Sequence, residues 1–96
     1  MILEWEPAPL VEMRKLACVF SADDPEKAYR FVNEIEEATG TILRDPETPR
    51  EFERGFRKMR LESFPYTLIY TIQSEYIWIV SLVHQNRHPD YWKRNS

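Results

Sequence analysis

The sequence is poor in cysteine, in glycine and in long apolar runs, and each shortage excludes a class of protein. The single cysteine, Cys18, cannot form an internal disulfide, which is typical of a protein in the reducing cytoplasm. With Gly40 and Gly55 as its only glycines, the chain cannot contain a glycine-rich phosphate-binding loop. No apolar run approaches the roughly 18 residues of a membrane span, and the opening MILEWEP lacks the features of a signal peptide. We therefore expect a cytoplasmic protein that does not contact a membrane.

Charge is distributed unevenly along the chain. Residues 1–49 hold 5 Lys or Arg against 11 Asp or Glu, whereas residues 50–96 hold 8 against 5. The net charge of -3 excludes a free-standing nucleic-acid-binding domain, which usually carries a large positive excess. Such a split can give an acidic helical side and a basic sheet side, but charge alone favours the simpler interpretation of an ordinary solvated surface.

The length and the periodicity predict one α+β domain covering residues 1–96. At 43% hydrophobic and 30% charged residues, the chain has the composition of a globular protein. Apolar spacing predicts a helix from about Leu10 to Phe20 and a second from the N-cap Asp24 to Asp45. Alternating patterns predict strands at 2–6, 58–62, 66–72 and 76–83. The order is β-α-α-β-β-β, a helical hairpin packed on a small, mainly antiparallel sheet.

The same patterns predict which side chains are buried. The first helix should bury Leu10, Met13, Leu16, Ala17 and Phe20, and Cys18 should pack among apolar neighbours. The second should bury Ala28, Phe31, Val32, Ile35, Ala38, Ile42 and Leu43. Gly40, inside this helix, suggests a second backbone packed close to it. In the long loop 46–56, Phe52 and Phe56 should pin the chain to the core.

The residues that could carry chemistry gather late in the sequence. Lys58 and Arg60 face outward on one strand, and His84, Arg87 and Tyr91 follow the last strand. Such a set could cleave RNA without a metal, by removing the 2′-hydroxyl proton, stabilising the phosphorane and protonating the leaving oxygen. It could equally form a basic recognition patch that docks an acidic partner. His84 and His88 have no further ligand at suitable spacing, so neither a metal nor another cofactor is expected.

With these residues in place, the chain resembles toxins of the RelE/ParE superfamily, from bacterial type II toxin–antitoxin, or plasmid stabilisation, systems. The resemblance covers nearly the whole chain. It rests on Trp5–Glu6–Pro7, Asp23–Asp24–Pro25, Gly55–Phe56–Arg57, Phe64–Pro65–Tyr66, Ile69–Tyr70, His84–Gln85–Asn86–Arg87–His88–Pro89 and Tyr91–Trp92. The fold of that superfamily agrees with the element order read from the periodicity.

The resemblance implies three alternative activities. A ParE-like toxin would inhibit growth by binding DNA gyrase, and the short Phe64–Pro65–Tyr66 hairpin with the ending that starts at His84 favours this branch. A RelE-like toxin would be a ribosome-dependent, metal-independent mRNA endonuclease. Its catalytic cations would then match Lys58, Arg60 and Arg87, with Tyr91 near the catalytic tyrosine and His84 as a further candidate. A third alternative is a non-toxic relative that only binds antitoxin.

Each alternative implies a protein partner. A co-encoded antitoxin should wrap the sheet and the helical hairpin with a segment that folds on binding, which gives a toxin–antitoxin hetero-oligomer.

Overall fold

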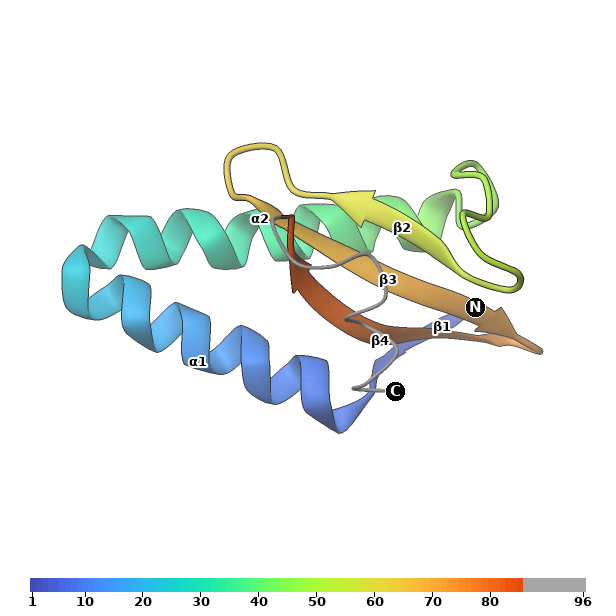
Figure 1. The fold of residues 1–96 in the computed structure, drawn as a ribbon, viewed down its shortest axis with the longest axis horizontal. Coiled ribbons are helices and arrows are strands. Elements are labelled where there is room, and N and C mark those ends of the chain that lie inside the picture. Colours follow the sequence, from blue (N-terminus) through green and yellow to red (C-terminus); the bar gives the residue numbers. More distant parts are fainter. Residues whose placement is uncertain (86–96) are drawn as a thin grey trace.

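The computed structural model describes residues 1–85 and confirms the α+β fold (Figure 1). The elements are β1 (Ile2–Trp5), α1 (Pro7–Asp23), α2 (Pro25–Arg44), β2 (Arg57–Arg60), β3 (Tyr66–Gln73) and β4 (Tyr76–His84). The helices form a hairpin that packs on one face of the sheet, the helix face, and we call the other the open face (Figure 1). The predicted order β-α-α-β-β-β is therefore correct.

The sheet is mixed, with the strand order β1-β4-β3-β2. Two of its three pairings are antiparallel, while β1 lies parallel to β4 with Ile2 opposite Tyr76. The sequence of β4 is apolar on both faces, which predicted a central strand, and β4 does lie inside the sheet, between β1 and β3.

A β-bulge interrupts the pairing of β3 with β4 between Ile69 and Tyr70. Before the bulge, Ile77 and Ile79 of β4 belong to the core under the helices. Beyond it, Leu82 belongs to that core, so the inward positions change from odd to even residue numbers. This change decides which way His84 faces at the end of the strand.

The main core lies between the helices and the sheet. The fully buried Phe31 of α2 stands at its centre, with ring centroids 5.1 Å from Phe20 of α1 and 5.2 Å from Phe64. Both pairs are edge-on, the arrangement that aromatic quadrupoles prefer. A smaller cluster on the open face consists of Ile69 and Val80 with Phe56, Trp78 and Val83.

The ends of the helices follow their capping signals. Asp24 caps α2 by accepting a hydrogen bond from the Glu26 amide at 3.0 Å, and Pro25 occupies the first helical position. The first helix is longer than predicted, because it begins at Pro7 and continues to Asp23. Its two prolines lie in the first turn, where an amide proton has no intrahelical acceptor, so they do not delay the helix.

Two predicted core residues on the helices are in fact exposed. Cys18 lies on the outer face of α1, and Leu43 retains 41% of its exposed area near the end of α2. The prediction for Gly40 was also wrong. A β-carbon built there would meet only Arg44 Nη1, at 3.7 Å, which is an ordinary contact and not a neighbouring backbone.

The loop before β2 is held by hydrogen bonds from side chains of β2 and β3, and only one of its two phenylalanines packs against the sheet. Phe56 packs on the open-face cluster, but Phe52 is 39% exposed, so the prediction that both reach the core was half wrong. Arg57 donates hydrogen bonds to the carbonyls of Pro49 (3.0 Å) and Glu47 (3.3 Å).

The buried Tyr70 contributes a second anchor. Its hydroxyl donates a 2.8 Å hydrogen bond to the carbonyl of Pro46. Burial raises the pKa of the Tyr70 phenol, and the positive charge of Arg57 opposes that rise in part. Arg57 and Tyr70 together therefore fix the path of the chain between α2 and β2.

Neither described helix is both long enough and apolar enough to cross a bilayer. Within residues 1–85, no three potential metal ligands lie together.

Candidate functional site

The two predicted cations of β2 lie on the open face of the sheet. Lys58 and Arg60 alternate with the inward Met59, and both are exposed. Lys58 Nζ stands 5.2 Å from the centre of the Phe52 ring, in cation–π geometry. Arg60 Nη2 donates to Gln85 Oε1 at 3.1 Å, which links the edge strand to the end of β4. The predicted outward orientation of both residues is correct.

His84 occupies the same end of the sheet but turns to the helix face. It pairs across the strands with Tyr66, and the two rings meet edge-on with centroids 5.1 Å apart. Tyr66 in turn packs against Phe31 of the main core. Because the bulge reverses the alternation of β4, His84 lies on the side of Leu82, away from Lys58 and Arg60.

The described part of the predicted site therefore divides between two faces. Lys58 and Arg60 stand together on the open face, and His84 belongs to the helix face. Arg87 and Tyr91 lie outside the described residues. An acid–base pair must reach the same reacting atoms, so His84 does not share one reaction centre with the two β2 cations in this arrangement.

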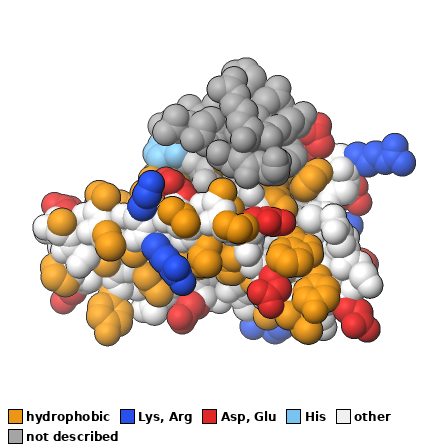
Figure 2. Space-filling model, turned by 90° about the horizontal axis from the view of Figure 1, so that it is seen from below, with side chains coloured by type: hydrophobic (Ala, Val, Ile, Leu, Met, Phe, Trp, Pro, Cys, Tyr) orange, Lys and Arg blue, Asp and Glu red, His pale blue; other side chains and the backbone are white. Residues whose placement is uncertain are grey.

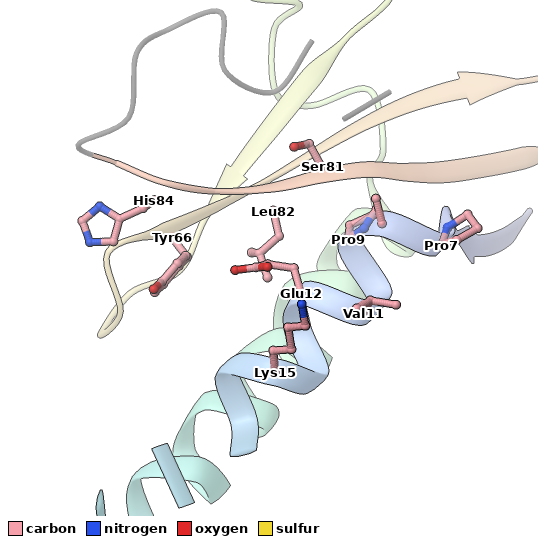
Figure 3. A pocket seen from close by; sticks show the side chains of 10 residues that line it. Pro7, Pro9, Val11, Glu12, Lys15, Tyr66, Ser81, Leu82 and His84 are labelled. Atoms are coloured by element: carbon pink, nitrogen blue, oxygen red, sulfur yellow. The ribbon is translucent and has the colours of Figure 1, made fainter. Parts of the chain in front are cut away.

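Beside His84, a hollow of about 690 Å³ opens between the start of α1, the start of β3 and the end of β4 (Figure 3). Glu12 and Lys15 rise from α1 on one side, while Tyr66 and His84 lie side by side on the other (Figure 3). The sequence interpretation missed Glu12 and Lys15. The signal was present, because they are two of the few charges in an otherwise apolar helix.

A second surface lies on the opposite side of α1 from the core, and we call it the α1 outer face. It consists of Val11, Arg14, Lys15, Cys18 and Val19, which line a shallow, open hollow of about 480 Å³. Figure 2, which views the hairpin from the α1 side, shows apolar side chains along the helices with charged side chains of both signs among them. Val11 is 49% and Val19 63% exposed, which is unusual for such side chains.

Comparisons with known proteins found one matching family model and solved structures of similar fold. The family model described as the ParE toxin of the type II toxin–antitoxin system parDE matches residues 3–89. No curated protein matches the chain. Among solved structures, a chain of the "Chromosomal ParDE TA system from P. aeruginosa" superposes with a TM-score of 0.68 at 19% sequence identity. The match covers 88% of this chain and 95% of that chain, and at this identity it establishes a shared fold.

Proposed function

The chain belongs to the ParE toxin family of type II toxin–antitoxin systems, and from this premise we propose that it inhibits growth by binding DNA gyrase. The single observation that carries the proposal is the match of the ParE model over residues 3–89, which includes nearly every element of the fold. The ParE and RelE branches share one fold but differ in their targets, so the fold alone does not choose between the targets. The match to the ParE model over most of the chain is what favours gyrase.

The geometry of the candidate site supports binding over catalysis. Lys58 and Arg60 are held by contacts with Phe52 and Gln85, as in a pre-organised recognition surface. His84, the only histidine among residues 1–85, lies on the other face of the sheet. A protein-binding toxin needs no convergent acid and base, so this division is compatible with its activity.

We further propose that a co-encoded antitoxin neutralises the toxin by forming a hetero-oligomer with it. The family premise supports this, and so does the solved ParDE system with which the chain shares its fold. Co-expression with the product of the adjacent reading frame should restore growth and yield a complex on size-exclusion chromatography. Continued growth arrest, with both proteins present and no complex, would contradict it.

A supercoiling assay tests the proposed target. Purified gyrase should lose supercoiling activity as this chain is added, and Lys58→Ala with Arg60→Ala should weaken that inhibition if the open face contributes to binding. Arg30→Ala, which removes an exposed cation from α2, is the matched control and should inhibit as the wild type does. Full gyrase activity at toxin concentrations that arrest growth would refute the gyrase proposal.

An mRNA endonuclease is the second candidate, since two exposed cations on one strand could contact phosphates. Mapping RNA 5′ ends soon after induction of the toxin alone separates the two. New ends within translated codons, lost in the Lys58→Ala and Arg60→Ala double variant, would establish the nuclease. Growth arrest without new ends would agree with gyrase, and an absence of arrest would identify a non-toxic, antitoxin-binding relative.

A further inference from the structure

The loop 45–56 is the longest connection between the described elements, and residues outside it hold it in both halves. Arg57 and Tyr70 donate three hydrogen bonds to backbone carbonyls in its first half. In its second half, the carbonyl of Gly55 accepts a 2.7 Å hydrogen bond from Thr71 Oγ1. Compact surface loops that are fixed by such contacts are frequently functional. The loop is therefore an ordered surface and a candidate for recognition.

The second half of the loop closes into a tight turn. Arg54 and Gly55 occupy its centre, between Glu53 and Phe56, which form an isolated bridge. Gly55 has a φ of 83°, a left-handed conformation that glycine adopts without strain. Its amide donates to Glu51 Oε1 at 2.7 Å. The turn thus holds Arg54 at a defined and exposed position.

The side chains that the loop exposes combine two cations with one aromatic ring. Arg50 and Arg54 are exposed, and neither forms an ion pair with any of residues 1–85. Phe52, between them in the sequence, keeps 39% of its area exposed, and the Lys58 ammonium lies over its ring. Arginine and aromatic side chains are enriched in protein interfaces and among the residues that contribute most to binding. The loop therefore has the composition of a protein-binding surface.

The charges of the loop favour a protein with acidic side chains over a nucleic acid as the partner. Asp45 and Glu47 are exposed in the same loop as Arg50 and Arg54. The dense and uniform negative charge of a DNA backbone would be repelled by the two carboxylates. A folded protein can instead place one acidic side chain opposite each arginine and leave the carboxylates in water.

We propose that the loop 45–56 binds an acidic surface of gyrase, with Arg50 and Arg54 opposite carboxylates and Phe52 inside the contact. The proposal rests on the proposed function and adds which surface of the toxin binds the target and by what chemistry. This surface lies toward the end of the sheet away from His84 (Figure 1). Because the loop is already ordered, binding does not have to order it, and less affinity is lost.

Binding of the purified toxin to immobilised gyrase, in the absence of DNA, tests the proposal directly. The double variant Arg50→Glu with Arg54→Glu should raise the Kd by about tenfold or more, because like charges then face each other. The control, Arg14→Glu with Arg30→Glu, makes the same change in net charge at exposed positions of the helices and should bind as the wild type does. Added salt should weaken binding of the wild type more steeply than binding of the loop variant.

A second loop variant tests the aromatic part of the contact. Phe52→Ala should weaken binding by about tenfold, whereas Tyr29→Ala, which removes a more exposed ring from α2, should not. Urea denaturation establishes that each variant is folded.

The possible results separate this proposal from the proposed function. If the wild type inhibits gyrase and the folded loop variants bind as tightly as it does, this proposal fails while the proposed function stands. Equal weakening by loop and control variants, or binding that requires DNA, would also overturn it. If the wild type neither binds nor inhibits gyrase, the proposed function fails as well.

Discussion

Replacing Tyr70 with phenylalanine should loosen the loop between α2 and β2 at a cost that depends on pH. The ring is fully buried, and Phe keeps its volume, so the substitution removes only the 2.8 Å hydrogen bond to the carbonyl of Pro46. Such a bond contributes about 1 kcal/mol to the free energy of unfolding, and Pro46 is half-buried, so water compensates its carbonyl in part. For a domain of this size, the melting temperature should fall by roughly 5 °C near pH 7.

The pH dependence follows from the raised pKa of the buried phenol. The unfolded chain ionises near the ordinary value of 10.0, and the folded chain ionises only at higher pH. The folded state therefore binds more protons above that value, and the stability of the wild type falls as pH rises past it. Tyr70→Phe lacks this contribution, so the stability difference between the two proteins should shrink above pH 10.0 by at most about 1.4 kcal/mol per pH unit.

Urea denaturation of the two proteins, at neutral pH and at a pH above 10.0, measures both effects. Tyr29→Phe is the control, because Tyr29 is 74% exposed and its hydroxyl should not affect unfolding at either pH. If Tyr70→Phe is as stable as the wild type near neutral pH, the hydrogen bond to Pro46 contributes nothing. If the difference stays constant on going to alkaline pH, the argument from burial is wrong.

Three further predictions concern stability and can be measured by the same denaturation curves. Arg57→Ala should cost roughly 2 kcal/mol, because two hydrogen bonds from a charged donor are lost, whereas Lys58→Ala next to it should cost little; equal effects would contradict the anchoring role. Gly40→Ala should stabilise by about 0.5–1 kcal/mol, while Gly55→Ala, at a φ of 83°, should destabilise by about 1 kcal/mol; changes of the same sign would refute the contrast. Ser81→Ala should leave stability unchanged or raise it by about 1 kcal/mol, since the buried Ser81 hydroxyl has no hydrogen-bond partner among residues 1–85; a clear loss would show that the hydroxyl is used.

Most of the fold could be predicted because local signals and tertiary packing agree. Asp24 and Pro25 mark the start of α2, and the alternation around Met59 and Leu68 correctly assigns their strand faces. The errors occur where one pattern allows two structures. Cys18 sits in an apolar stripe like a core residue, and periodicity does not reveal which of two apolar sides faces the sheet.

The candidate site was harder to predict, because its geometry depends on one inserted position. In a regular strand His84 would share a face with Trp78 and Val80, on the side of Lys58 and Arg60. The bulge in the pairing of β3 with β4, between Ile69 and Tyr70, turns His84 to the helix face. No residue type in the sequence of β4 indicates that a bulge occurs there. The orientation of Lys58 and Arg60 was predicted correctly, because β2 has no such interruption.

The parallel pairing of β1 with β4 also determines when the sheet of the toxin can form during synthesis of the chain. Ile2 is made well before Tyr76, so its strand has no hydrogen-bonded neighbour in the sheet until β4 has been made. Two strands that are this far apart in the sequence pair late in folding, because the entropic cost of closing the long loop arises before the contact can stabilise the chain. A nascent chain, or a fragment truncated before β4, lacks the strand that joins β1 to the rest of the sheet. We therefore expect growing and prematurely terminated chains to be harmless to the cell that makes them.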